Sequence, residues 1–170
     1  MTGRALIICV SVHHGNTAAV ARAIAAALKA DVREPEEVDP ATLATYDVVG
    51  FGSGIFYGSH HHRLRQYIEH LPDVTGTRAF VFTTAGQGRA QSLPWQRPLD
   101  SVLRDKGFDV MGSFACRGFD TWLPLGLVGG INKKHPDVVD LTQAYEFGEL
   151  IASQVPSRLP SRRRPRRAAG

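Results

Sequence analysis

The segment 11–17 contains residue types that could together bind a phosphate group. Gly15 would let the backbone turn tightly, and the helical pattern that starts at Thr17 would present unpaired N–H groups and the positive end of its dipole. The alternative is that Asn16 or Thr17 only caps that helix. The candidate phosphate-binding residues are Ser11, His13, His14, Gly15, Asn16 and Thr17.

Two further segments could contact a flat ring. In 53–59, Phe56 and Tyr57 stand beside glycines. Exposed aromatic rings are costly on a loop unless they cover something flat, although either ring could instead fold back into the core. The segment 84–88 could place backbone N–H and C=O groups against a ring edge. The candidates in these two segments are Ser53, Gly54, Ile55, Phe56, Tyr57, Gly58, Thr84, Ala85, Gly86, Gln87 and Gly88.

The elements that must position these segments are predicted from hydrophobic patterns. Apolar runs typical of strands covered on both faces occupy 5–10, 48–51, 79–83 and 108–115, with a weaker strand near 31–33. Helical patterns start at Thr17, run over 64–71, extend from Pro98 to a closing glycine at 107, and occupy 137–155. The last pattern predicts that Leu141, Ala144, Leu150 and Ile151 face inward.

Strands that alternate with helices imply a single α/β domain with a parallel sheet and right-handed crossovers. In such sheets ligands bind beyond the carboxyl ends of the strands, where strand order reverses, and all three candidate segments leave strands at that edge. The stretch 117–135 has no clear periodicity, yet it holds Phe119, Trp122 and Leu123. Loops of about nineteen residues are uncommon in compact domains and are more often functional than not.

The composition and the absence of other motifs narrow the function further. Of 170 residues, 43% are hydrophobic and 21% charged, which excludes disordered and fibrous chains, and no apolar run is long enough to span a membrane. No G-x-x-x-x-G-K-[ST], G-x-G-x-x-G, G-x-S-x-G or H-E-x-x-H motif is present, which argues against several nucleotide-binding and hydrolase classes. Cys9 and Cys116 lie far apart without a C-x-x-C spacing, which favours reduced thiols in a cytoplasmic protein.

The net charge of +4 comes from the last thirteen residues, which contain six arginines. Without them, residues 1–157 hold 14 basic and 16 acidic side chains. Because Pro160 and Pro165 interrupt the arginines, the segment 158–170 is predicted to be a disordered tail beside a folded domain over 1–157. Alternatively, the tail contacts RNA, an acidic protein or anionic lipid; no aromatic or glycine interleaving indicates specific nucleic-acid recognition.

The loop 11–17, the run 47–58 and the segments 116–121 and 129–133 together resemble the flavodoxin-like proteins, in particular short bacterial and archaeal members. The resemblance covers about residues 4–152. It implies a doubly wound five-stranded parallel sheet in the order 2-1-3-4-5, in three α/β/α layers, with FMN at the point where strand order reverses. The usual S-x-T-G-N-T of the family is altered here, because one residue is added and His14 replaces the threonine before the glycine.

The resemblance also implies roles for the candidate segments. The loop 11–17 would hold the FMN phosphate, 53–58 would cover one face of the isoalloxazine with Phe56 or Tyr57 stacking, and 84–88 would meet its other face or edge. Trp122 or Phe119 would supply a further ring. Flavodoxins that carry electrons are markedly acidic, whereas this body is only slightly so, which distinguishes its docking partners from theirs.

Five histidines belong to this region: His13 and His14 lie in the first segment, and His60, His61 and His62 follow the second. No carboxylate or thiol joins them at ligand spacing, which favours polar helix starts, or electrostatics toward a phosphate or flavin, over a metal site. The expected function is an FMN-binding protein that exchanges electrons with a redox partner. The alternatives are an FMN-dependent oxidoreductase acting on a quinone, a porphyrin precursor or NAD(P)H, with 117–135 shaping the pocket, and a regulatory or binding module without flavin.

Overall fold

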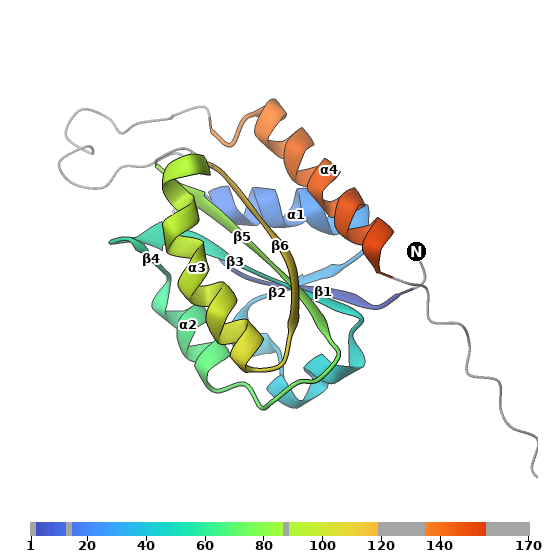
Figure 1. Cartoon of the computed structure of the whole chain (residues 1–170). Helices are drawn as coiled ribbons and strands as arrows, with labels where there is room; N and C mark the ends of the chain where they lie inside the picture. The colour runs from blue at the N-terminus through green and yellow to red at the C-terminus, as the bar shows by residue number, and fades with distance from the viewer. Residues whose placement is uncertain (1–2, 13–14, 87–88, 119–134, 156–170) are drawn as a thin grey trace, which may run out of the picture.

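The computed structural model describes residues 3–12, 15–86, 89–118 and 135–155, which fold around one sheet (Figure 1). Its parallel strands run in the order β2-β1-β3-β5-β6. A short strand, β4, pairs antiparallel with the end of β3. The bounds are β1 Ala5–Val10, β2 Asp31–Arg33, β3 Val48–Phe56, β4 Ser59–His60, β5 Arg78–Ala85 and β6 Asp109–Arg117. The order of the parallel strands confirms the predicted 2-1-3-4-5 sheet.

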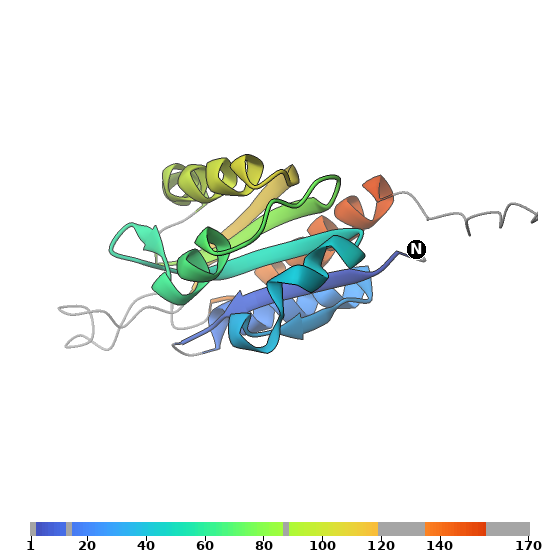
Figure 2. The same cartoon turned by 90° about the horizontal axis from the view of Figure 1, so that it is seen from below.

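Helices cover both faces of the sheet and complete the three layers (Figure 2). The helices α1 (Asn16–Leu28) and α4 (Val138–Gln154) pack on one face, and α2 (His62–Glu69) and α3 (Arg89–Asp105) pack on the other. Two 3-10 turns, Pro35–Glu37 and Pro40–Thr45, connect β2 to β3. Each helix returns the chain from the carboxyl edge of the sheet to its amino edge, so every parallel strand ends at the same edge.

Burial on both faces explains the continuous apolar runs of the strands. Every residue of β1 is buried; Ile7 and Cys9 face α1 and α4, whereas Leu6 and Ile8 face α2 and α3. In β3 the glycines 50 and 52 provide space for phenyl rings of β5. A Cβ atom on either glycine would lie within 2.3 Å of a ring atom of Phe80 or Phe82.

Three sequence-based expectations differ from the structure. Helix α3 begins at Arg89, so Pro98 lies inside it and does not open it. Leu150 is 54% exposed instead of facing inward, because Gly148 and Ile151 occupy the buried side of α4. A Cβ at Gly148 would lie 2.8 Å from the Ala27 Cβ, and this close approach to α1 sets the rotation of α4. The third difference lies in residues 53–59, which belong to the candidate site and are described with it.

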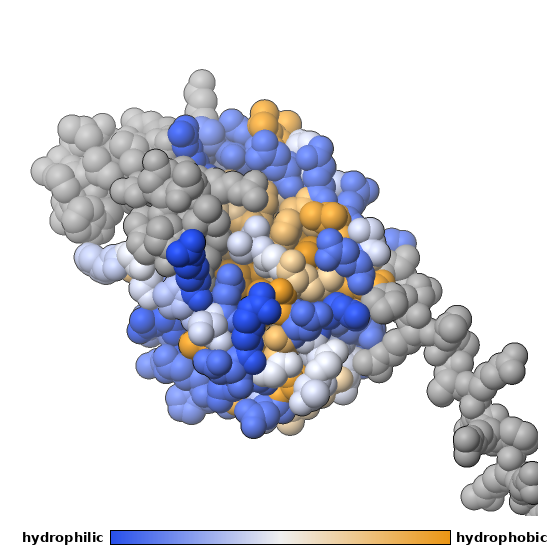
Figure 3. Space-filling model, in the orientation of Figure 1, coloured by the Kyte–Doolittle hydropathy of each residue, from blue (hydrophilic) through white to orange (hydrophobic). Residues whose placement is uncertain are grey.

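The surface between α3 and α4 is a band of more apolar residues along β6, while hydrophilic residues dominate around it (Figure 3). Val138 and Val139 at the start of α4 are also exposed, at 80% and 62%. No helix in the described ranges is both long and apolar enough to cross a membrane. The last described residue is Val155, so the predicted domain boundary at 157 and the arginine-rich tail lie outside the described residues.

Candidate functional site at the carboxyl edge of the sheet

The start of α1 has the geometry of an anion-binding site. Gly15 is its N-cap and has a φ of 68°, a left-handed conformation that favours glycine. As a glycine it offers no side-chain acceptor, and the first turn holds no acidic residue. The Ala18 N–H donates to Ser11 Oγ at 3.2 Å, which holds the strand end against the helix start. Neither Asn16 nor Thr17 is the cap, because both lie within the helix; His13 and His14 lie outside the described residues.

The first and third candidate segments meet at two buried hydroxyl groups. Thr17 Oγ1 and Thr84 Oγ1 are 2.8 Å apart and hydrogen-bonded. A Cβ at Gly54 would lie 3.8 Å from the same Thr17 oxygen, which brings β3 to this point as well. The predicted juxtaposition of the three segments at one edge is therefore present for these residues. Gln87 and Gly88 lie outside the described residues.

A fourth segment, at the end of β6, also reaches this point. Gly118 donates its N–H to the Ala85 carbonyl at 2.9 Å. A Cβ on Gly118 would lie 2.9 Å from Asn16 Nδ2 and 3.3 Å from Thr84 Cβ. The sequence analysis did not select Gly118 as a site residue, although it sits in the segment 116–121 that carries the flavodoxin resemblance. Phe119 and Trp122 lie outside the described residues.

The segment 53–59 is a β-hairpin and not a loop. Strand β3 continues to Phe56, and Ile55 and Phe56 pair with His60 and Ser59 across a two-residue turn. Tyr57 and Gly58 form this turn with φ values of 50° and 74°, as a type I′ hairpin requires. The turn signal in the sequence was therefore the pair Tyr57-Gly58, not the whole glycine-rich run.

The hairpin presents its two aromatic rings differently. Tyr57, at the tip, is 88% exposed and does not fold back into the core. Phe56 is half-buried, and its ring meets that of His61 edge-on with the centroids 5.3 Å apart. Tyr57 is thus the ring of the two that is available to cover a flat ligand.

The Ser53 hydroxyl fastens the base of this hairpin. It donates to the Gly54 carbonyl at 2.9 Å, accepts the His61 N–H at 3.0 Å, and lies 3.1 Å from His60 Nδ1. Since the hydroxyl proton is already used, His60 donates from Nδ1 and keeps a lone pair on Nε2. Ser53 is fully buried, so its side chain acts within the hairpin and not on the surface of the site.

His60 is a buried histidine held in its neutral form. Its Nε2 atom is buried and has no hydrogen-bond partner among the described residues. Burial, and to a smaller extent the charge of Arg65, lowers the pKa of His60 to about 4. Its neighbour His61 is the N-cap of α2 and accepts the Arg63 N–H at 3.3 Å, which agrees with the interpretation of these histidines as a polar helix start.

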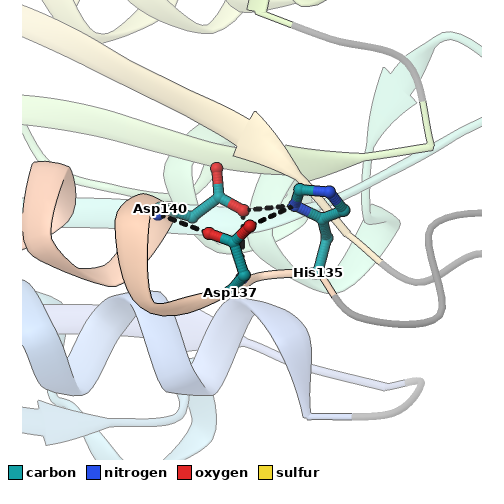
Figure 4. A group of neighbouring side chains, drawn as sticks. All are labelled: His135, Asp137 and Asp140. Atoms are coloured by element: carbon teal, nitrogen blue, oxygen red, sulfur yellow. Dashed lines mark hydrogen bonds and ion pairs between the residues drawn. The ribbon is translucent and has the colours of Figure 1, made fainter.

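A histidine that the sequence analysis did not select lies at the start of α4 (Figure 4). His135 Nδ1 lies 2.5 Å from Asp140 Oδ2 and 3.7 Å from Asp137 Oδ2. Asp137 and Asp140 form a capping box: Asp137 Oδ1 accepts the Asp140 N–H, and Asp140 Oδ2 accepts the Asp137 N–H. The sequence signal was the D-x-x-D spacing just after a histidine. The three residues are close enough to chelate a metal, but the helix start already uses two of the carboxylate oxygens.

The two cysteines are unpaired and buried, as predicted for reduced thiols. Burial raises the pKa of Cys9 to about 12. It raises the pKa of Cys116 to the same value, with smaller contributions from the negative charges of Asp140 and Asp137. Both thiols are therefore protonated at neutral pH and unreactive.

A family model described as "Flavodoxin domain" matches residues 7–109. An uncharacterized protein from Methanocaldococcus jannaschii is 38% identical over 148 residues, which are 87% of this chain and 97% of that protein. The chain belongs to the flavodoxin domain family. The expectation drawn from the glycine-rich segments is confirmed at the level of family and fold.

Solved structures share the flavodoxin fold at low sequence identity. An archaeal flavodoxin matches with a TM-score of 0.66 and 19% identity, over 89% of this chain and 98% of its own. An NADH:FMN oxidoreductase in its apo form matches with a TM-score of 0.64 and 19% identity, over 94% and 93%. A rubredoxin oxygen:oxidoreductase from Desulfovibrio gigas matches with a TM-score of 0.69 and 13% identity, over 89% of this chain but 36% of its own.

Proposed function

We propose that this flavodoxin-family chain binds FMN at the carboxyl edge of its sheet and functions in electron transfer. The observation that carries the proposal is the glycine-led start of α1, whose N-cap offers no side-chain acceptor and whose first turn holds no acidic residue, beside the contact of Thr17 with Thr84. The backbone N–H groups of a helix start and the positive end of its dipole favour a phosphate dianion. When bound, FMN supplies the redox chemistry, while the protein sets its orientation and access.

The described residues fit such a ligand at both of its ends. Gly15 has no heavy atom within 4 Å of where a Cβ would stand, so the turn is open on that side. The phosphate would be held by the backbone of the α1 start together with Ser11 and Asn16, whereas the Thr17 hydroxyl is used by Thr84. Tyr57 would cover the ring from the hairpin, and the backbone of Ala85 and Gly86 would lie along its edge.

The test is a comparison of FMN with riboflavin, which lacks the phosphate. Titrating each flavin with the full chain and following quenching of flavin fluorescence gives both dissociation constants. FMN is expected to bind at least about tenfold more tightly, since charged hydrogen bonds contribute about 1.5–3 kcal/mol. No quenching by the protein would contradict FMN binding, and equal affinities would contradict a phosphate site at α1.

A flavin oxidoreductase that acts on a small substrate is the second candidate function. The pairing of His135 with Asp140 favours it, because a pure electron carrier needs no oriented proton donor. One assay with FMN-loaded protein distinguishes the two functions. An oxidoreductase would oxidise NADH or reduce a quinone without an added protein, whereas an electron carrier would need a reductase to reduce it and a partner to accept its electrons.

We further propose that the segment 158–170 binds an acidic partner and that the protein resides in the cytoplasm, which suits its two unpaired thiols. Deleting 158–170 should leave FMN affinity and Tm unchanged, because the segment has no apolar face to join the core. It should weaken binding to polyglutamate and flatten the salt dependence of that binding. A fall in Tm of several degrees would show that the segment packs on the domain.

A further inference from the structure

We propose that His135, oriented by Asp140, exchanges a proton with a small redox substrate at the carboxyl edge of the sheet. This inference rests on the proposed binding of FMN and specifies the oxidoreductase alternative. It assigns a chemical role to a residue outside the three glycine-rich segments.

The imidazole of His135 is oriented through one of its ring nitrogens, Nδ1. Asp140 Oδ2 accepts the proton on Nδ1 at 2.5 Å, and the same oxygen accepts the Asp137 N–H at 3.0 Å. The Asp140 side chain is 16% exposed, so its position is fixed by the helix start that it caps. A carboxylate that accepts from Nδ1 fixes the tautomer and leaves Nε2 as the nitrogen that can exchange a proton.

Figure 4 shows where this second nitrogen lies. The imidazole stands beside the end of β6, on the side of the two aspartates that faces the carboxyl edge, and its second nitrogen is turned away from both carboxylates. Among the described residues, none forms a hydrogen bond with this nitrogen. The side chain of His135 is 26% exposed, so solvent can restore or remove the proton.

The pair lies beside the end of β6, at the edge of the sheet where the flavin site is proposed (Figure 4). The charges of Asp137 and Asp140 act on the thiol of Cys116, the residue just before the last one of β6. Two residues beyond that cysteine, Gly118 packs against Asn16 and Thr84. The end of β6 thus connects the His135–Asp140 pair to the point where α1 and β5 meet.

The contrast with His60 supports this assignment. Both histidines are hydrogen-bonded through Nδ1, His60 to Ser53 and His135 to Asp140. His60 is 4% exposed and is held in its neutral form by burial, so it cannot exchange protons with solvent near neutral pH. His135 combines a fixed orientation with access to water, which are the two requirements of a general acid or base.

The proposed step balances for a quinone as substrate. Bound FMN in its reduced form would supply a hydride, which is two electrons and one proton, and the His135 imidazolium would supply the second proton from Nε2, so that the quinone becomes a hydroquinone. The imidazole, now neutral, then takes a proton on Nε2 from solvent, while Nδ1 keeps its own proton and its hydrogen bond to Asp140 throughout. In the reverse direction Nε2 accepts the proton of the substrate hydroxyl.

The experiment compares two electron acceptors on the same FMN-loaded protein. The protein is reduced with dithionite and mixed in a stopped-flow instrument with 1,4-benzoquinone, which needs protons, or with ferricyanide, which takes one electron and no proton. His135→Gln should slow the quinone reaction about a hundredfold and leave the ferricyanide reaction within about twofold. Added imidazole should partly restore the quinone rate. His70→Gln, a change at the exposed histidine that caps the C-terminal end of α2, should alter neither rate.

A second readout needs no activity. Nitrogen-15 NMR of the unloaded chain should show His135 protonated on Nδ1, and Asp140→Asn should change that tautomer balance while preserving an acceptor for the helix cap. Failure of the wild-type chain to bind FMN would overturn the proposed function. Normal FMN binding with equal rates in His135→Gln and wild type, or with both acceptors slowed equally, would overturn the role of His135.

Discussion

The two edges of the sheet use the same kinds of residues for different purposes. At the amino edge, the Arg4 N–H donates to Asp47 Oδ2 at 2.8 Å, the Asp47 N–H donates to the Arg4 carbonyl, and the Arg4 guanidinium lies 4.8 Å from the centre of the Tyr46 ring. The Lys106 ammonium donates to the Leu71 carbonyl at 2.8 Å. These polar groups at the amino edge are therefore used in contacts within the protein.

At the carboxyl edge, polar groups are left available. The N-cap of α1 is a glycine without a side-chain acceptor, and the outer nitrogen of His135 points away from its aspartates. The proposed function therefore predicts that the amino edge contributes mainly stability, whereas the carboxyl edge gives up some stability for ligand binding. Substitutions at the two edges can test whether one edge serves mainly stability and the other mainly ligand binding.

The largest expected effect is at the amino edge, at Gly107. Its φ is 88°, and a Cβ there would lie 2.5 Å from the Val74 carbonyl oxygen. We expect Gly107→Ala to lower the free energy of unfolding by about 2–5 kcal/mol, from left-handed strain together with overpacking against backbone. Urea denaturation measures the loss. FMN affinity of the folded protein should stay as in wild type, and a specific loss of FMN affinity would contradict the division between the edges.

The second effect is an acid sensitivity that originates at the carboxyl edge. Because the pKa of His60 is about 4 in the folded chain and near its ordinary 6.5 when unfolded, the unfolded state binds a proton first as pH falls. Stability is therefore fully present above pH 6.5 and decreases toward pH 4, by about 3 kcal/mol in total. His60→Asn, which can keep the bond to Ser53, should flatten this part of the profile, whereas His70→Asn should not. Parallel profiles for all three proteins would rule out His60 as the source.

The third effect is on binding and not on stability. Tyr57→Ala should weaken FMN binding by about 1–3 kcal/mol through loss of stacking, and it should leave the free energy of unfolding within about 0.5 kcal/mol because the side chain is exposed. Tyr145→Ala, at a tyrosine on α4 that is 42% exposed, is the matched control and should change neither quantity. Isothermal calorimetry separates the two variants. Equal FMN affinities would show that the hairpin tip does not cover the ring.

The smallest expected effect is at Gly15, which like Gly107 has a positive φ but lies at the carboxyl edge. Gly15→Ala creates no close contact within the protein, so it should cost only about 1–2 kcal/mol of stability from backbone strain. Its effect on FMN should exceed its effect on riboflavin, since the added methyl group stands beside the proposed phosphate. The ratio of the two dissociation constants in this variant and in wild type is the quantity to measure, and an unchanged ratio would place the phosphate elsewhere.

The sequence was sufficient to predict the sheet and its edge because those features depend on local patterns. β1 and β2 match their predicted ranges, and the junction of Thr17, Gly54 and Thr84 follows from strand order alone. The hairpin was not predicted because the glycines of this segment indicated a loop and gave no sign of the antiparallel pairing of Ile55 with His60. The start of α3 was not predicted because proline is typical of the first turn of a helix, whereas Pro98 is the tenth residue of this helix.

The pair of His135 with Asp140 could not be predicted as part of the site for a different reason. Its sequence signal, a capping box, reports only the start of a helix. Whether the preceding histidine turns toward the helix or away from it depends on how α4 sits on α1 and β6. That placement is determined by contacts such as Gly148 against Ile24, which a single sequence does not reveal.

The hairpin also divides β3 into two parts with different dynamics. The last pairing of β3 with β5 joins Gly54 to Thr84, so the residues beyond it pair in the sheet with β4 and not with β5. Amide hydrogens of the central part of β3 should exchange with solvent only when the whole domain unfolds, whereas those of Ile55 and His60 can exchange when the hairpin alone opens. Slower exchange confined to these hairpin amides would therefore report occupation of the carboxyl edge without any optical signal from the ligand.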